Sequence, residues 1–115
     1  MGTNYSVGTL TKHGPHICHL EVTEVLLHGD PRKGFGITLD SGGHLQEELL
    51  DPPIISHIEP KSPAERCGVL QEGDRVLAIN GQYLEHRTLQ EALDMLNETP
   101  TKVIVTVEFE VAGGC

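Results

Sequence analysis

Short segments in which apolar and polar residues alternate recur along the chain, and this period of two predicts β-strands. The first segment changes parity, with Leu20 and Val22 on one face and Val25 and Leu27 on the other, which indicates a bulge or a twist near Thr23. The dipeptide at positions 80 and 81, Asn-Gly, predicts a tight hairpin. The strands that we expect are 19–27, 35–39, 54–58, 75–79, 83–84 and 102–111.

Two capping patterns predict two helices between these strands. Ser62 can cap a helix with Glu65 as its capping-box partner, and Gly68 can end that helix after a single short turn. The same box recurs as Thr88 with Glu91, at the start of a helix that runs to about residue 97. The element order is therefore β-β-β-α-β-β-α-β. It predicts a mainly β fold with mostly antiparallel neighbours and two α-helices.

A length of 115 residues is that of one domain. Residues 1–17 are rich in Gly, Thr and His without an apolar period, so we expect a flexible arm there. We expect the folded domain over 18–111, a loose tail over 112–115, and an acidic loop over 41–53. No run of about 18 apolar residues is present, so we expect no membrane-spanning helix.

The net charge is −9, from 17 acidic and 8 basic residues. Phosphates of nucleic acids and anionic membrane surfaces repel such a chain, so we expect neither as a partner. The 3 cysteines are widely spaced, which favours a reducing cytoplasmic setting over a disulfide framework. The His-rich segment at 13–19 matches no standard metal spacing, and no strained nucleophile motif is present. We therefore expect no cofactor, no metal site and no enzymatic activity.

Three segments together resemble one family. The sequence Gly-Phe-Gly-Ile at 34–37 opens the second strand, residues 62–81 run from the first helix cap to the hairpin, and residues 88–96 form the second helix. Their caps, spacing and turn are similar to those of PDZ domains, over about residues 20–110. The resemblance implies a five- or six-stranded antiparallel sandwich or partial barrel capped by two α-helices. The sequences at 24–27, 52–55 and 64–68 further resemble a central PDZ module of the glutamate-receptor-interacting scaffold proteins.

The glycines near the start of the second strand fit an anion cradle. Glycine permits left-handed angles and close backbone approach, so the successive N–H groups that follow Gly34 can converge on a carboxylate. Taken alone, the same glycines also fit an ordinary strand start. The resemblance implies that a peptide C-terminus is held there while the peptide pairs with 35–39 as an added strand. The peptide-binding residues that we expect are Lys33, Gly34, Phe35, Gly36, Ile37, Thr38, Leu39, Leu89, Leu93 and Leu96.

Leu89 stands at the position that the resemblance implies is the specificity residue. Many family members carry a histidine there that bonds a Ser or Thr two residues before the ligand's end. Leucine has no polar group, so we expect tails of the pattern X-φ-X-φ-COOH, where φ is hydrophobic. The resemblance implies a non-catalytic adaptor for C-terminal tails of membrane receptors or their associated proteins. It would be cytoplasmic and recruited to the inner face of the plasma membrane or the synapse.

A structural role is the alternative. Leu89, Leu93 and Leu96 lie on one side of the second helix and Ala92 and Met95 on another, so the second stripe could border a groove or belong to a wide core face. In the latter case the groove is idle, and the chain packs against a neighbouring PDZ domain in a multi-domain scaffold. The loop 41–53 could then lie over the groove.

Overall fold

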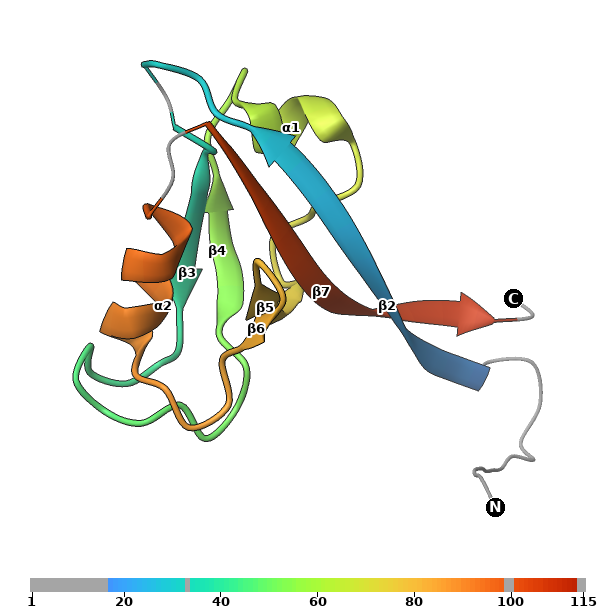
Figure 1. Cartoon of the computed structure of the whole chain (residues 1–115). Coiled ribbons are helices and arrows are strands. Elements are labelled where there is room, and N and C mark those ends of the chain that lie inside the picture. Colours follow the sequence, from blue (N-terminus) through green and yellow to red (C-terminus); the bar gives the residue numbers. More distant parts are fainter. Residues whose placement is uncertain (1–16, 33, 99–100, 114–115) are drawn as a thin grey trace.

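The computed structural model describes residues 17–32, 34–98 and 101–113, and Figure 1 shows their arrangement. The strands form one 6-stranded antiparallel sheet in the order β2-β7-β5-β4-β3, with β6 paired to β5. The sheet is unclosed, because β2 and β3 lie at its two ends. The expected mainly β fold with two helices is confirmed. Its elements are β2 (Ile17–His28), β3 (Ile37–Asp40), β4 (Ile54–Ile58), α1 (Pro63–Cys67), β5 (Arg75–Ile79), β6 (Gln82–Tyr83), α2 (Leu89–Leu96) and β7 (Lys102–Gly113).

The longest pairing joins β2 to β7 in a twisted ribbon that extends away from the rest of the domain (Figure 1). Its register is unbroken along the whole of both strands, so of the bulge or twist expected near Thr23 the bulge is wrong, whereas the ribbon is twisted. The change of parity has another cause: Leu20 and Val22 lie on the outer face, 53% and 56% exposed, whereas Val25 and Leu27 are buried in the core.

The ends of the ribbon differ from the expected boundaries. Strand β7 continues to Gly113, so residues 112 and 113 belong to the strand rather than to the predicted tail. Residues 1–16 of the predicted arm lie outside the described residues, as do 114 and 115. Register shifts occur elsewhere, between Thr38 and Leu39 in the β3–β4 pair and between Val76 and Ala78 in the β5–β7 pair.

An aliphatic core packs between the sheet and the helices. The inward side chains of β7 are at its centre, with Val103, Val105 and Val107 at most 1% exposed. Helix α2 contributes Leu89, Ala92 and Leu96. The described helices include none with the length and apolar character that crossing a bilayer requires.

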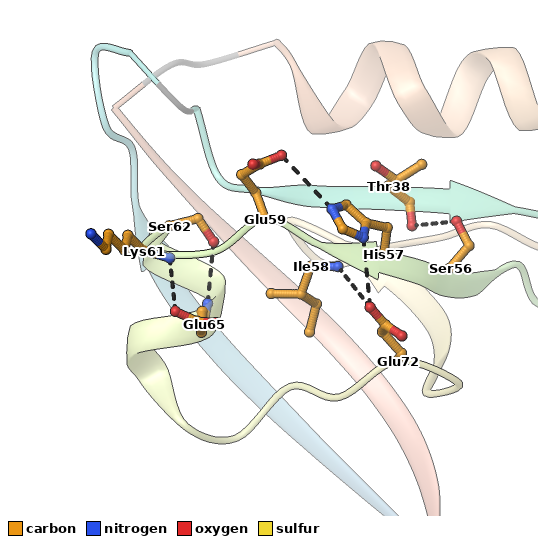
Figure 2. A network of polar contacts seen from close by, with 9 residues as sticks. All are labelled: Thr38, Ser56, His57, Ile58, Glu59, Lys61, Ser62, Glu65 and Glu72. Atoms are coloured by element: carbon orange, nitrogen blue, oxygen red, sulfur yellow. Dashed lines mark hydrogen bonds and ion pairs between the residues drawn. The ribbon is translucent and has the colours of Figure 1, made fainter.

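Both helices begin at the predicted caps, but only one has the complete box. The Thr88 hydroxyl accepts from the Glu91 N–H, and the Glu91 carboxylate accepts from the Thr88 N–H at 2.8 Å. In α1 the Ser62 hydroxyl accepts from the Glu65 N–H at 3.3 Å, and Gly68 ends the helix in the left-handed region. The Glu65 carboxylate, however, accepts from the Lys61 N–H at 2.7 Å, so the predicted second half of that box is wrong (Figure 2).

Candidate functional site

The loop that leads into β3 closes on itself before the strand begins. Asp30 and Gly34 exchange two backbone hydrogen bonds, of 2.9 and 2.8 Å. The next carbonyl, that of Phe35, accepts from the Ala64 N–H in the first turn of α1 at 3.1 Å. The N–H groups of Phe35 and Gly36 have no hydrogen-bond acceptor among the described residues. Two successive backbone donors are thus left available where the loop meets the strand.

Two glycines in the left-handed region flank Phe35 and give the loop its shape. Gly34 has a φ of 61° and Gly36 a φ of 87°. In a turn that contains left-handed residues, successive N–H groups can converge on a common point and form a concave anion-binding nest. Gly36 also packs directly on the fully buried Ser62, and a Cβ at position 36 would lie closer than 3.0 Å to the Ser62 side chain. The first turn of α1 therefore supports the cradle from behind.

Strand β3 has an open edge next to this cradle. The Gly36 carbonyl accepts from the Glu59 N–H at 2.8 Å, and the Thr38 carbonyl accepts from the Ser56 hydroxyl at 3.2 Å, so both face β4. Backbone groups of successive residues in a strand point to opposite sides. The N–H and C=O groups of Ile37 and Leu39 therefore face away from β4, where β3 is the last strand of the sheet. Helix α2 lies along this side of β3 (Figure 1).

A pocket lies where the cradle, the start of β3 and the end of α2 meet. Of the predicted site residues, six line it, and Lys33 lies outside the described residues. Leu39, Leu89 and Leu93 do not line it. Glu59 and Asn97 were not predicted, because Glu59 reaches the pocket only through the pairing of β3 with β4, and Asn97 only through the packing of α2. The lining residues are Arg32, Gly34, Phe35, Gly36, Ile37, Thr38, Glu59, Leu96 and Asn97.

The chemistry of this pocket combines backbone donors with an apolar wall. Phe35 and Leu96 are 6% and 5% exposed, and Ile37 is half-buried. Arg32 adds a positive charge at the mouth and Glu59 a negative one. A group with a carboxylate beside an aliphatic side chain matches the pocket, because the carboxylate can accept from the free N–H groups and the side chain can contact the apolar wall.

Helix α2 presents one apolar face rather than two. Leu89, Ala92 and Leu96 are buried together, and Leu93 and Met95 flank them as partly buried side chains. The separate stripe expected for Ala92 and Met95 is therefore absent from this helix. Leu89 is only 4% exposed, so little of it is available to a ligand in this conformation.

The acidic loop 41–53 is attached to the start of α2. The Leu49 N–H donates to the Arg87 carbonyl at 2.7 Å, and the Gln90 N–H donates to the Leu45 carbonyl at 3.0 Å. Glu48 bonds the Nδ1 of His86 at 2.7 Å. The hydrogen bond that the His86 ring donates to the Glu48 carboxylate, together with the negative charges of Glu85 and Glu48, raises the pKa of His86 above its usual value of 6.5. The loop thus borders the end of α2 that is opposite the pocket.

The outer face of the β3–β4 pair is polar and acidic. The exposed ring of His57 lies between two carboxylates, with its Nε2 at 3.8 Å from Glu59 and its Nδ1 at 3.7 Å from Glu72 (Figure 2). Glu72 also accepts from the Ile58 N–H at 3.4 Å. No set of three metal-ligating side chains that could hold an ion occurs in the described ranges.

Comparison with known sequences identifies relatives of this chain. The chain is 52% identical to Glutamate receptor-interacting protein 2 of Xenopus laevis over 101 residues, which are 86% of this chain and 9% of the relative. It is 51% identical to Glutamate receptor-interacting protein 1 of Homo sapiens over 98 residues, or 84% of the chain and 9% of the relative. The chain therefore corresponds to about a tenth of the length of these proteins.

Solved structures show the same fold. The second PDZ domain of Dlg1 from the choanoflagellate Monosiga brevicollis matches with a TM-score of 0.65 and 30% identity, over 76% of this chain and 97% of that one. The PDZ domain of choanoflagellate SHANK1, which was solved bound to a GIRK3 peptide, matches with a TM-score of 0.67 and 21% identity, over 79% of this chain and 94% of that one. The family model of the PDZ domain matches residues 24–108. The chain belongs to the PDZ domain family, a family of non-enzymatic protein-interaction modules.

Proposed function

We propose that this domain captures the free C-terminus of partner proteins by adding the tail as a strand to β3. The observation that carries this proposal is the cradle: the free N–H groups of Phe35 and Gly36 adjoin the open edge of β3. A terminal carboxylate would accept from those groups, and the tail's backbone would pair with Ile37 and Leu39. The last side chain would enter the pocket beside Phe35 and Leu96.

A preference for a hydrophobic residue two positions before the end rests on Leu89. Side chains of an added strand alternate, so the residue two before the last points the same way as the last, toward α2. Leu89 begins that helix and offers no hydrogen-bonding group. Burying a Ser or Thr hydroxyl against leucine without a partner costs about 1–3 kcal/mol, which favours an aliphatic tail.

The partners that we propose are C-terminal tails of membrane receptors or of proteins associated with them. The names of the relatives, Glutamate receptor-interacting proteins 1 and 2, support a receptor-scaffold role. In that role the domain would work in the cytoplasm, at the inner face of the plasma membrane or at a synapse.

Titration of the ¹⁵N-labelled domain with three matched peptides tests this function. The peptides end in Val-X-Val, Thr-X-Val and Val-X-Val-amide. We expect the first to bind best, the second more weakly, and the amide to lose most of the affinity, because charge-assisted bonds to the carboxylate contribute about 1.5–3 kcal/mol each. The amide signals of residues 35–39 should shift on binding. Equal binding of all three peptides contradicts carboxylate capture.

A structural role is the second candidate, and one observation favours it. Leu39 on β3 and Leu89 on α2 are only 6% and 4% exposed, and neither lines the pocket. Little of either side chain is therefore available to a tail that pairs along β3. Under this alternative the groove stays idle and the domain packs against a neighbouring PDZ domain. Failure of all free C-terminal peptides to bind the domain is the result that this alternative predicts.

A further inference from the structure

A second pocket lies away from the cradle, on the side of the domain formed by β5, β6 and the end of the acidic loop. It is a cavity of about 200 Å³ and shares no residue with the first pocket. Its lining residues are Leu49, Leu50, Asp51, Pro52, Val76, Leu77, Tyr83, Leu84 and Glu85.

The floor of this second pocket is part of the core and its rim is exposed. Leu49, Val76 and Leu84 are 6%, 1% and 1% exposed, so their packing fixes the shape of the floor. Leu50 and Tyr83 at the rim are 88% and 68% exposed. Two large apolar side chains exposed beside an apolar cavity are typical of an interaction site.

The charged side chains that line the second pocket are all acidic. Asp51 and Glu85 are its ionisable lining groups apart from the Tyr83 phenol, and no cation lines it. The side chain of Glu85 is 80% exposed, and one of its carboxylate oxygens lies 3.8 Å from the Nε2 of His86. Arg87, two residues further on, donates from its guanidinium to the Tyr83 carbonyl and to Gln82, and it is not among the residues that line the pocket. A cationic ligand therefore meets two carboxylates with no competing positive charge in the lining.

We propose that this second pocket binds an internal segment of a partner protein in which one leucine-sized or phenylalanine-sized side chain is flanked by lysine or arginine. The size argues for one such side chain, since an apolar cavity of about 150 Å³ already accommodates benzene. The acidic rim selects the flanking cations, and the domain's net charge of −9 attracts them from a distance. No free C-terminus is needed, because the contacts of the proposed ligand come from its apolar side chain and its flanking cations.

The probe is the blocked peptide acetyl-Lys-Arg-Leu-Arg-Lys-amide, which has no carboxylate for the first pocket. Added to the ¹⁵N-labelled domain, it should shift the amide signals of Leu50, Leu77 and Tyr83 and leave those of residues 34–38 unchanged. Replacement of the peptide's leucine by serine should remove detectable binding. Replacement of its cations by glutamates should do the same.

Charge reversal of the rim is the matched test on the protein. The double variant Asp51→Lys with Glu85→Lys should weaken binding of the probe roughly tenfold, since two exposed ion pairs become repulsions. The control Glu24→Lys with Glu110→Lys makes the same change in net charge on the outer face of the β2–β7 ribbon, and it should change binding by less than twofold. Both should bind a Val-X-Val tail as the wild type does.

Three results overturn the proposal: no binding of the probe, equal binding of the serine peptide, or equal weakening by the control variant. Shifts confined to residues 34–38 also overturn it, because they place the peptide in the first pocket. The first three results do not bear on C-terminal capture, which the Val-X-Val and amide pair tests separately.

Discussion

Gly36 is the position where a single methyl group should do most damage to the proposed carboxylate cradle. Its φ of 87° is unfavourable for any residue with a Cβ, at a cost of about 1–2 kcal/mol. A Cβ there would also lie closer than 3.0 Å to the Cβ and Oγ of Ser62, which is fully buried and caps α1. Forcing an extra group into a packed site costs about 1–3 kcal/mol more. We therefore expect Gly36→Ala to lower the free energy of unfolding by about 2–5 kcal/mol.

Gly34 provides the matched control on the same loop. Its φ is 61°, but a Cβ there would meet nothing within 4 Å, so Gly34→Ala carries only the backbone cost of about 1–2 kcal/mol. Urea unfolding followed by circular dichroism measures both variants. A second variant isolates the clash: Ser62→Gly removes the atoms that a Cβ at position 36 would contact, and glycine is itself tolerated as a helix cap. In the Ser62→Gly protein, Gly36→Ala should lower the free energy of unfolding by no more than Gly34→Ala does.

The peptide-binding measurement completes this test. Gly36→Ala should abolish binding of the Val-X-Val tail under conditions where the protein is still folded, because the N–H groups of the cradle are displaced. Equal losses of stability in the Gly36→Ala and Gly34→Ala proteins, with and without Ser62, would refute the steric reasoning. Undiminished tail binding by folded Gly36→Ala would refute the role of the cradle.

Three further predictions concern the edges of the site. Thr88→Ala should lower stability by about 1 kcal/mol in the same urea assay, since the Glu91 N–H loses its cap, and Thr88→Ser should restore it. Because Glu48 raises the pKa of His86, folding favours the protonated form of this side chain. The resulting stabilisation of the folded state is complete below about pH 6.5 and is lost as pH rises through the higher pKa of folded His86. His86→Asn, which tolerates the left-handed backbone there, should therefore be less stable than wild type at about pH 5.5 and equal to it at about pH 9; a gap that widens with pH contradicts the pairing. Leu89→His should raise the affinity for Thr-X-Val relative to Val-X-Val. The ratio of the two affinities is compared between variant and wild type, because lost core packing weakens both peptides alike; an unchanged ratio contradicts a role of Leu89 in specificity.

Local signals in the sequence predicted the elements of this fold well. Hydrophobic alternation, two caps and one hairpin dipeptide depend on residues within a few positions of one another, and their positions agree with the strands and helices. The predicted box of α1 fails because of the turn that precedes the helix. The Ser62 N–H donates to the Glu59 carbonyl at 3.2 Å, so Glu65 closes on Lys61 instead, at a turn where Lys61 has a φ of 64°. No pattern within the helix could have shown this.

The candidate site divides in the same way. Its backbone part was predictable, because glycines flanking an aromatic residue indicate a loop with unusual angles and available donors. Its side-chain part was not, because Glu59 and Asn97 join the pocket through the pairing of β4 and the packing of α2. The sequence predicts only an acidic loop over 41–53, yet Leu49 within it is 6% exposed and belongs to the core. Burial of one residue in an acidic segment depends on the tertiary fold, and sequence periodicity carries no signal for it.

Leu49 connects the second pocket to the helix that borders the first. Its backbone N–H bonds the Arg87 carbonyl at the start of α2, while its side chain forms part of the floor of the second pocket. A substitution at Leu49 would therefore disturb the helix that borders the first site as well as the cavity of the second. Asp51 and Glu85 lie at the rim of the second pocket and do not line the first. Reversing their charges changes what the second pocket attracts and leaves in place the packing that positions α2, so those two residues, rather than the buried leucine, can separate the two binding functions.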